Sequence, residues 1–338
     1  MQKNGKFNSR ALVKMFNLLI VGVDGLDYNL FKKLDCAKYC PLFVYKMVPE
    51  NPITGPSWTT IYTGVSCLKH EIFDLFGREV NSSVSAEKRA TDIFGNKVNF
   101  SRSPASLKYP YLWNHLNSQG IETELVDLPV TYPPAPVNGF LICGRFIPLV
   151  SKSTFTFPKS VQNNLPSWYP TIIDWGLHHK EVPQKQKGLG SRIQQIKSCG
   201  KYINPLKEIE EMENEKVNIF ASLHSNEAQF GFIQFSFVDM LGHLAPEFIH
   251  KAYPVVVRLI NTVLNKLKPK NILLISDHGF SLEPQPHHTF HGIIGTYGQN
   301  FKSLKPSTLF ANVDVAPIVL DFFGIKKPKY FDGVSKLQ

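Results

Sequence analysis

The chain has 338 residues, of which 43% are hydrophobic and 19% are charged, and its formal net charge is +10. This composition is typical of a globular protein and excludes a largely disordered chain, and no apolar run approaches the ~20 residues that a membrane helix needs. Because the lysines are spread along the chain, the positive charge indicates a solvated basic surface rather than a nucleic-acid-binding motif.

The first predicted element is a strand at residues 17–23, which ends at the turn signal Asp24-Gly25. Its continuous apolar run favours a parallel strand that is buried on both faces. Further strands are predicted at 122–127, 140–143, 231–238 and 271–275, and helices from Pro56 onward and at 113–120, 256–267 and 314–323. The helices follow from apolar residues at helical spacing and from prolines, glycines and aspartates at their ends. This alternation predicts a mostly parallel α/β sheet with helices on both faces.

The stretch from about residue 145 to residue 216 has a different character. Four prolines, at 158, 166, 170 and 183, precede the charged segment KEIEEMENEK. We interpret the range 145–225 as a cap that is inserted into a core formed by residues 1–144 and 226–338. Insertions of this kind often close over a binding site.

Three of the predicted strands end in aspartates, namely Asp24, Asp239 and Asp277. A single aspartate there is usually a turn or cap residue, but ligands of open α/β sheets bind beyond the carboxyl ends of the strands, where all three would converge. Histidines accompany two of them, since His243 follows Asp239 by four residues and His278 follows Asp277 directly. Three more follow closely: His287, His288 and His291. Mixed Asp and His ligands are typical of Zn²⁺ or Mn²⁺, whereas Mg²⁺ and Ca²⁺ prefer oxygen alone.

Further motifs occur around these residues in a fixed order. The chain reads LLIVGVDG at 18–25, ITGPSWTTIYTGVSCLKHEIF at 53–73 and LVDLPVTYPPAPVNG at 125–139; the D-x-x-x-H, S-D-H-G and H-x-x-x-G motifs follow, and then DVAPIVLDFFGIKKPKYFDG at 314–333. In this order the sequence resembles the alkaline phosphatase superfamily, in its type I phosphodiesterase and nucleotide pyrophosphatase branch. The resemblance covers most of the chain and is weak from about 145 to 225. It implies an alkaline phosphatase-like three-layer α/β sandwich with an inserted cap.

The resemblance also implies a site for two divalent metal ions, with Zn²⁺ preferred and Mn²⁺ as the alternative. One ion would be held by Asp24, Thr54, Asp277 and His278, and the other by Asp239, His243 and His288. We prefer His288 to His287 and His291 because Gly292 follows it at the family spacing.

In the same way, the resemblance implies that Thr54 is a nucleophile that forms a phospho-threonine, with Gly55 and Ser57 at the phosphoryl group. A threonine hydroxyl needs a metal or a base to lower its pKa, and the predicted helix start just after Thr54 favours a phosphate oxygen. The alternative for Thr54 is a helix N-cap. Two positions depart from the family, which usually has asparagine where this chain has Ser57 and glycine where it has Glu71. Both differences weaken the inference that this chain shares the nucleotide specificity of the family. We interpret His70 as structural.

We therefore expect a metal-dependent phosphoric ester hydrolase, a phosphodiesterase or nucleotide pyrophosphatase that acts on a small-molecule phosphate ester or nucleotide. A phosphomonoesterase, a phosphonate hydrolase or a non-catalytic binding protein on this fold is the alternative. A sulfatase is disfavoured, because the C/S-x-P-x-R motif of the family's sulfatases needs a convertible cysteine or serine and an arginine at the positions where this chain has Thr54 and Trp58. The absence of a signal peptide pattern and the five irregularly spaced cysteines favour a reducing compartment, so we expect a cytoplasmic protein. The sequence leaves the oligomeric state open.

Overall fold

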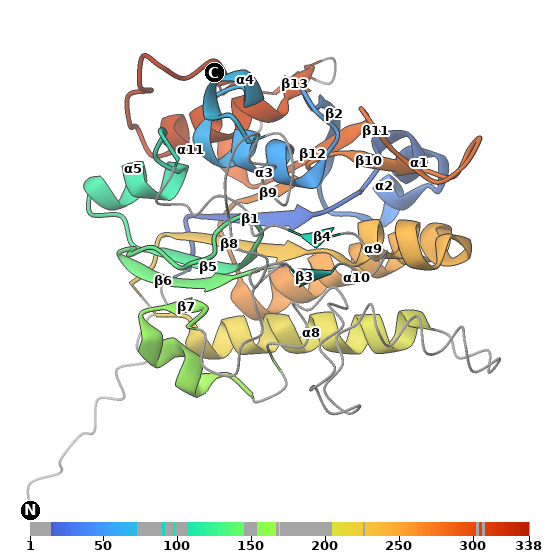
Figure 1. Cartoon of the computed structure of the whole chain (residues 1–338), viewed down its shortest axis with the longest axis horizontal. Helices are drawn as coiled ribbons and strands as arrows, with labels where there is room; N and C mark the ends of the chain where they lie inside the picture. The colour runs from blue at the N-terminus through green and yellow to red at the C-terminus, as the bar shows by residue number, and fades with distance from the viewer. Residues whose placement is uncertain are drawn as a thin grey trace, which may run out of the picture.

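The structure is a computed structural model that describes residues 15–72, 107–144, 154–166, 169, 205–225, 227–301, 304–305 and 308–337, together with two short strands at 90–91 and 97–98. In these residues a large sheet lies between two layers of helices (Figure 1). Most strand pairs in the sheet are parallel. The predicted three-layer α/β sandwich is thereby confirmed. No helix within these ranges is both long enough and apolar enough to cross a membrane.

The nine-stranded sheet has the order β13-β2-β12-β9-β1-β8-β5-β6-β7. Its strands are β1 (Leu18–Val23), β2 (Phe43–Val48), β5 (Thr123–Leu128), β6 (Gly139–Cys143), β7 (Thr156–Phe157), β8 (Phe230–Phe235), β9 (Ile272–Ile275), β12 (Gly292–Tyr297) and β13 (Phe310–Ala311). Two small sheets pair β3 (Ala90–Thr91) with β4 (Lys97–Val98) and β10 (Gly279–Ser281) with β11 (His287–Thr289). Central strand β1 is parallel to both β8 and β9, so the carboxyl ends of these three strands meet at one edge.

Helices cover both faces of this sheet. Above it in Figure 1 lie α3 (Thr54–Thr63), α4 (Cys67–His70), α5 (Leu112–Ser118) and α11 (Val315–Phe322), and below it lie α8 (Pro205–Leu223) and α10 (Ile249–Leu267). The remaining helices are α1 (Tyr28–Lys33), α2 (Cys36–Tyr39) and α9 (Phe237–Leu244), with 3-10 turns at Lys159–Asn164, Pro246–Phe248, Gln299–Phe301 and Asn312–Asp314. All residues of β1, β5 and β8 are buried, as expected for strands that are covered on both faces.

Two predicted elements in the second half of the chain differ clearly from the structure in their boundaries. The predicted strand 231–238 ends at Phe235 and is followed by helix α9, so Asp239 lies in the first turn of a helix. Nearly all of α9 is buried, and apolar periodicity cannot separate such a helix from a buried strand. The helix predicted from residue 256 begins at Ile249 and continues through Pro254. Ile249 and Tyr253, which precede that proline in the helix, are both buried, and such packing contributes most of the stability of a helix in a protein.

Two described parts of the range 145–225 belong to this core. Strand β7 pairs with β6 in antiparallel fashion, and α8 packs along α10. Most of the other residues in the range lie outside the described residues. The boundaries of an inserted cap therefore stay a prediction.

Candidate active site

The first predicted ligand group comes together at the carboxyl ends of β1 and β9. Asp24 directly follows β1, and Asp277 and His278 follow β9. The Nε2 atom of His278 lies 3.4 Å from Oδ1 of Asp24, 3.3 Å from Oδ2 of Asp277 and 3.3 Å from the hydroxyl oxygen of Thr54. All four side chains are buried. Neighbouring parallel strands that end in polar residues thus produce a compact set of possible ligands.

The second predicted group lies directly beside the first. Asp239 and His243 are one turn apart on α9, so their side chains share a face of the helix. His288 comes from β11, and its Nε2 atom lies 2.9 Å from Nε2 of His243 and 3.1 Å from Oδ1 of Asp239. The rings of His278 and His288 stack with their centroids 4.0 Å apart. The two groups therefore form one continuous site.

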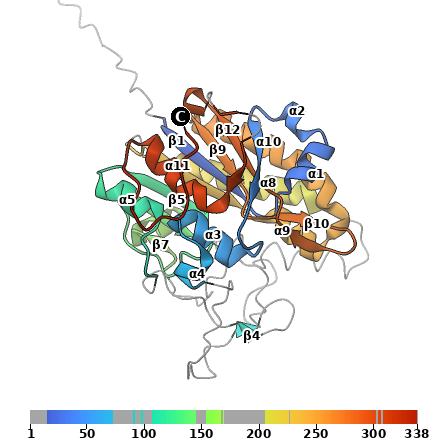
Figure 2. The same ribbon diagram turned by 90° about the horizontal axis from the view of Figure 1, so that it is seen from above.

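Of the three neighbouring histidines, only His288 points into this group. The Nδ1 atom of His287 lies 2.7 Å from the carbonyl oxygen of Gln285, and Nδ1 of His291 lies 2.9 Å from the side-chain nitrogen of Asn29. Helix α9 lies beside strand β10 of the β10–β11 hairpin in both views (Figure 2). The β10–β11 hairpin is joined to the segment before α3, since Nδ1 of His288 lies 2.8 Å from the carbonyl oxygen of Pro52.

The orientation of the two central imidazoles supports cation binding. Nδ1 of His278 lies 3.1 Å from the carbonyl oxygen of Gly279, and Nδ1 of His288 contacts Pro52 in the same manner. A carbonyl oxygen only accepts hydrogen bonds, so Nδ1 carries the proton and Nε2 of the neutral ring presents its lone pair to the carboxylates. The carboxylate and imidazole ligand atoms of each group, which are those of Asp24, Asp277 and His278 in the first and of Asp239, His243 and His288 in the second, lie within 4.8 Å of one another. Acceptors that face acceptors at this spacing fit a divalent cation between them.

The shifts of the pKa values of His278 and Asp239 favour deprotonated ligands, which metal binding requires, whereas the pKa of His288 shifts in the opposite sense. Burial lowers the pKa of His278 to about 3, and the nearby His288 acts in the same direction. Burial would raise the pKa of Asp239, but His243 and His288 outweigh it and hold this pKa well below its usual value. For His288, burial would lower the pKa, but the contact with Asp239 and the charge of that carboxylate raise it overall. A proton and a metal ion would thus compete for Nε2 of His288.

Helix α3 presents Thr54 to the site as its first residue. The N-cap position is occupied by Ile53, so Thr54 does not cap this helix. The first N–H groups of a helix have no partner inside it, and the N–H of Gly55 is one of these. Ser57 is fully buried and turned toward the interior, where its hydroxyl donates to the carbonyl oxygen of Asp277 (2.6 Å) and accepts from the side chain of Asn312 (3.0 Å). A contact of Ser57 with substrate stays a prediction.

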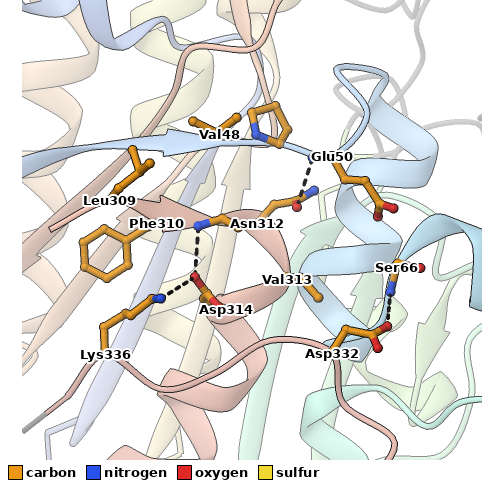
Figure 3. Close-up of a pocket in the computed structure, with 12 residues that line it drawn as sticks. Val48, Glu50, Ser66, Leu309, Phe310, Asn312, Val313, Asp314, Asp332 and Lys336 are labelled. Carbon is orange, nitrogen blue, oxygen red and sulfur yellow. Dashed lines mark hydrogen bonds and ion pairs between the residues drawn. The ribbon is translucent and has the colours of Figure 1, made fainter.

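Asn312, which donates to the hydroxyl of Ser57, also lines a cavity of about 420 Å³ (Figure 3). The cavity is lined among others by Glu50, Asp314, Asp332 and Lys336, and by none of the predicted ligands. The side-chain oxygen of Asn312 accepts from the N–H of Glu50 (3.3 Å). The cavity wall is therefore connected to the backbone of Asp277 through Asn312 and Ser57.

Two contacts at or beside the predicted ligands do not follow from the sequence motifs. The indole N–H of Trp58 donates to Oδ2 of Asp24 (3.2 Å), and the hydroxyl of Thr289 donates to Oδ2 of Asp27 (2.6 Å) next to His288. The glycine inside the apolar run of β1, Gly22, could have indicated the first contact, because a glycine in a strand often marks a place where another group approaches the backbone closely. The sequence held no comparable signal for the second.

His70 is the last residue of α4 and is buried against α3. Its Nδ1 accepts from the N–H of Ile72 (3.1 Å), and its Nε2 lies 3.0 Å from the hydroxyl of Thr60. The next residue, Glu71, has a φ of 59° and so adopts the left-handed conformation that glycine favours. Glu71 thus adopts the conformation that a glycine at this position would favour, and its carboxylate lies 2.8 Å from the amine of Lys108.

Several solved structures share this fold. The wild-type alkaline phosphatase PafA is 12% identical, with a TM-score of 0.58 over 95% of this chain and 98% of that chain. Murine ectonucleotide pyrophosphatase/phosphodiesterase 5 is 11% identical, with a TM-score of 0.51 over 92% and 96%. A putative sulfatase from Bacteroides thetaiotaomicron is 12% identical, with a TM-score of 0.56 over 96% and 74%. At such identities the likeness shows the fold alone.

No curated protein matches this chain. The model of the family "type I phosphodiesterase / nucleotide pyrophosphatase", however, matches residues 18–298, which includes every predicted ligand. The chain therefore belongs to the type I phosphodiesterase/nucleotide pyrophosphatase family, whose members are hydrolases of the alkaline phosphatase superfamily.

Proposed function

We propose that this protein hydrolyses a phosphodiester or pyrophosphate bond in a small molecule or nucleotide, with Thr54 as the nucleophile. The observation that carries the proposal is the position of the Thr54 hydroxyl. It lies at the start of α3 and 3.3 Å from Nε2 of His278, at the edge of the first ligand group. Family membership supports the reaction class, and a small-molecule substrate fits that family.

The two ligand groups support two divalent cations. Asp24, Thr54, Asp277 and His278 would hold one, and Asp239, His243 and His288 would hold the other. The mixture of imidazole and carboxylate favours Zn²⁺, with Mn²⁺ as the second candidate. When bound, such cations neutralise charge on phosphoryl oxygens and lower the pKa of hydroxyl groups or water.

The side chains and backbone of α3 would carry out the transfer. The Thr54 oxygen, once it has lost its proton, forms a bond to phosphorus in line with the leaving group. The bond from phosphorus to the leaving-group oxygen breaks, and the leaving-group oxygen takes up a proton. Water then attacks the phosphorus of the phospho-threonine. The bond from phosphorus to the Thr54 oxygen breaks, that oxygen takes up a proton, and phosphate or a phosphate monoester is released. The N–H of Gly55 is the candidate donor to a phosphoryl oxygen, because the start of a helix favours such an anion.

We also propose that the protein acts in the cytoplasm. Support comes from the described cysteines, Cys36, Cys40, Cys67 and Cys143, which are all buried free thiols. Structural disulfides are rare in reducing compartments.

The test is hydrolysis of bis(4-nitrophenyl) phosphate by metal-free protein that has been reloaded separately with Zn²⁺ and Mn²⁺. We expect activity that needs metal, is abolished in Thr54→Ala and is partly retained in Thr54→Ser, because serine keeps the hydroxyl. Undiminished turnover by Thr54→Ala would refute the nucleophile. 4-Nitrophenyl phosphate and a phosphonate monoester serve as parallel substrates. Faster turnover of either would replace the diesterase by a phosphomonoesterase or a phosphonate hydrolase, and no turnover of any would favour a binding protein.

A further inference from the structure

The indole of Trp58 makes one polar contact, and this contact is with a predicted metal ligand. The side chain is 0% exposed, and its Nε1 lies 3.2 Å from Oδ2 of Asp24. An indole N–H donates and never accepts, so Asp24 must be the acceptor. The other oxygen of the same carboxylate, Oδ1, lies 3.4 Å from Nε2 of His278. The two oxygens of Asp24 therefore have different surroundings, one facing the indole and the other facing the ligand group.

We propose that Trp58 is a positioning residue for the first metal site, because its N–H holds Oδ2 of Asp24 so that Oδ1 is the ligand atom. This inference rests on the proposed function. Partners of this kind fix the orientation of ligands, and losing one typically weakens metal affinity by about 10- to 100-fold. Without the N–H, this restraint on which oxygen of Asp24 serves as the ligand would be lost.

The main chain of β1 provides the space for this indole. A Cβ atom at Gly22 would lie 2.8 Å from Cη2 of Trp58 and 3.2 Å from the ring of Phe232. A glycine weakens the interior of a strand, so its presence in the central strand β1 needs a reason, and the close approach of the indole supplies one. The ring of Trp58 also stacks on that of Tyr62, at a centroid distance of 5.8 Å. The direction of the N–H is thus fixed by packing from two sides.

The experiment is a titration of the metal-free protein with Zn²⁺ against a chromophoric chelator, which reports affinity without turnover. Asp277→Asn and His243→Ala assign the two metal equivalents to the first and second group. We expect Trp58→Phe to weaken the first equivalent by about 10- to 100-fold and to leave the second unchanged. Tyr62→Phe is the matched control, because it removes a polar group from the same aromatic cluster without touching Asp24.

A shape-preserving variant separates positioning from packing. Site-specific replacement of Trp58 by 3-benzothienylalanine exchanges the N–H for sulfur at nearly unchanged ring size, and it remains informative if Trp58→Phe does not fold. The same selective loss of the first equivalent would support the proposal. Unchanged affinity, or an equal loss of both equivalents, would overturn it while leaving the proposed function intact. If the wild-type protein binds no divalent ion, the proposed function fails, and the role of Trp58 fails with it.

Discussion

His70 gives the fold a pH dependence whose size follows from the structure. The imidazole is 2% exposed. Burial lowers its pKa from 6.5 to about 4, against a smaller opposite effect from the carbonyl of Pro56. The folded protein therefore prefers the neutral ring, whereas the unfolded chain takes up a proton at the ordinary pKa. Protonation of His70 thus favours unfolding.

The sign and the magnitude follow from proton linkage. Between the two pKa values the unfolded state binds more protons, so the free energy of unfolding rises with pH. With values of 6.5 and about 4, the contribution is nearly complete at about pH 7, and about 2 kcal/mol of it is lost at about pH 5. The loss continues as the pH falls toward the pKa of the folded state.

Urea unfolding of wild type and His70→Asn at the two pH values measures this contribution. The asparagine keeps an acceptor for the N–H of Ile72 and cannot titrate. Both proteins are measured with a chelator present, so that the remaining histidines contribute equally to the two. We expect the wild type to lose about 2 kcal/mol more than the variant on going from about pH 7 to about pH 5. Equal losses in the two proteins would refute the assignment to His70.

Two further predictions concern stability. The amine of Lys216 is buried and lies 2.5 Å from a carboxylate oxygen of Asp127 and 2.7 Å from one of Glu213. Because Lys216→Met leaves these two carboxylates without their cation, we expect it to lower the free energy of unfolding, measured in urea, by about 3–5 kcal/mol. An unchanged free energy of unfolding would mean that the two acids protonate at little cost. Phe331 is 4% exposed and lies so close to Gly64, the residue that ends α3, that a Cβ atom there would be 2.7 Å from the ring. We expect Phe331→Ala to cost about 3–5 kcal/mol in the same assay, and a loss below about 1 kcal/mol would show that the C-terminal segment does not anchor α3.

The sequence predicted the meeting of Asp24 and Asp277 for a sound physical reason. Both follow apolar runs, and such runs form adjacent parallel strands whose carboxyl ends lie at one edge. Asp239 also reaches this edge although its strand was predicted too long, because α9 starts almost directly after β8. A misplaced element boundary thus did not displace the side chain from the site.

Other parts of the site depend on contacts that no local pattern encodes. The β10–β11 hairpin that carries His288 consists of two strands of three residues each, which are too short for a clear period of alternation. The contact between Trp58 and Asp24 spans 34 residues of sequence, and that between Asn312 and Ser57 spans 255. Such pairs become neighbours only through tertiary packing, so the direction of the Ser57 hydroxyl was not predictable from its place beside Thr54.

The hydrogen bonds that join Asn312 to Ser57 and Ser57 to Asp277 bear on how much of the chain is needed to hold helix α3 in place. The family match ends at residue 298, yet Asn312 lies beyond it and holds the hydroxyl of Ser57. Still further along, Asp332 accepts from the N–H of Ser66 just after α3, and its own N–H donates to the carbonyl of Gly64. A fragment that ends at residue 298 would retain every predicted ligand, but it would lose the hydrogen bonds from Asn312 and Asp332 to α3 and to the residues just after it. The hydrogen bonds that hold α3 in this chain therefore come from well past the segment that the family model matches.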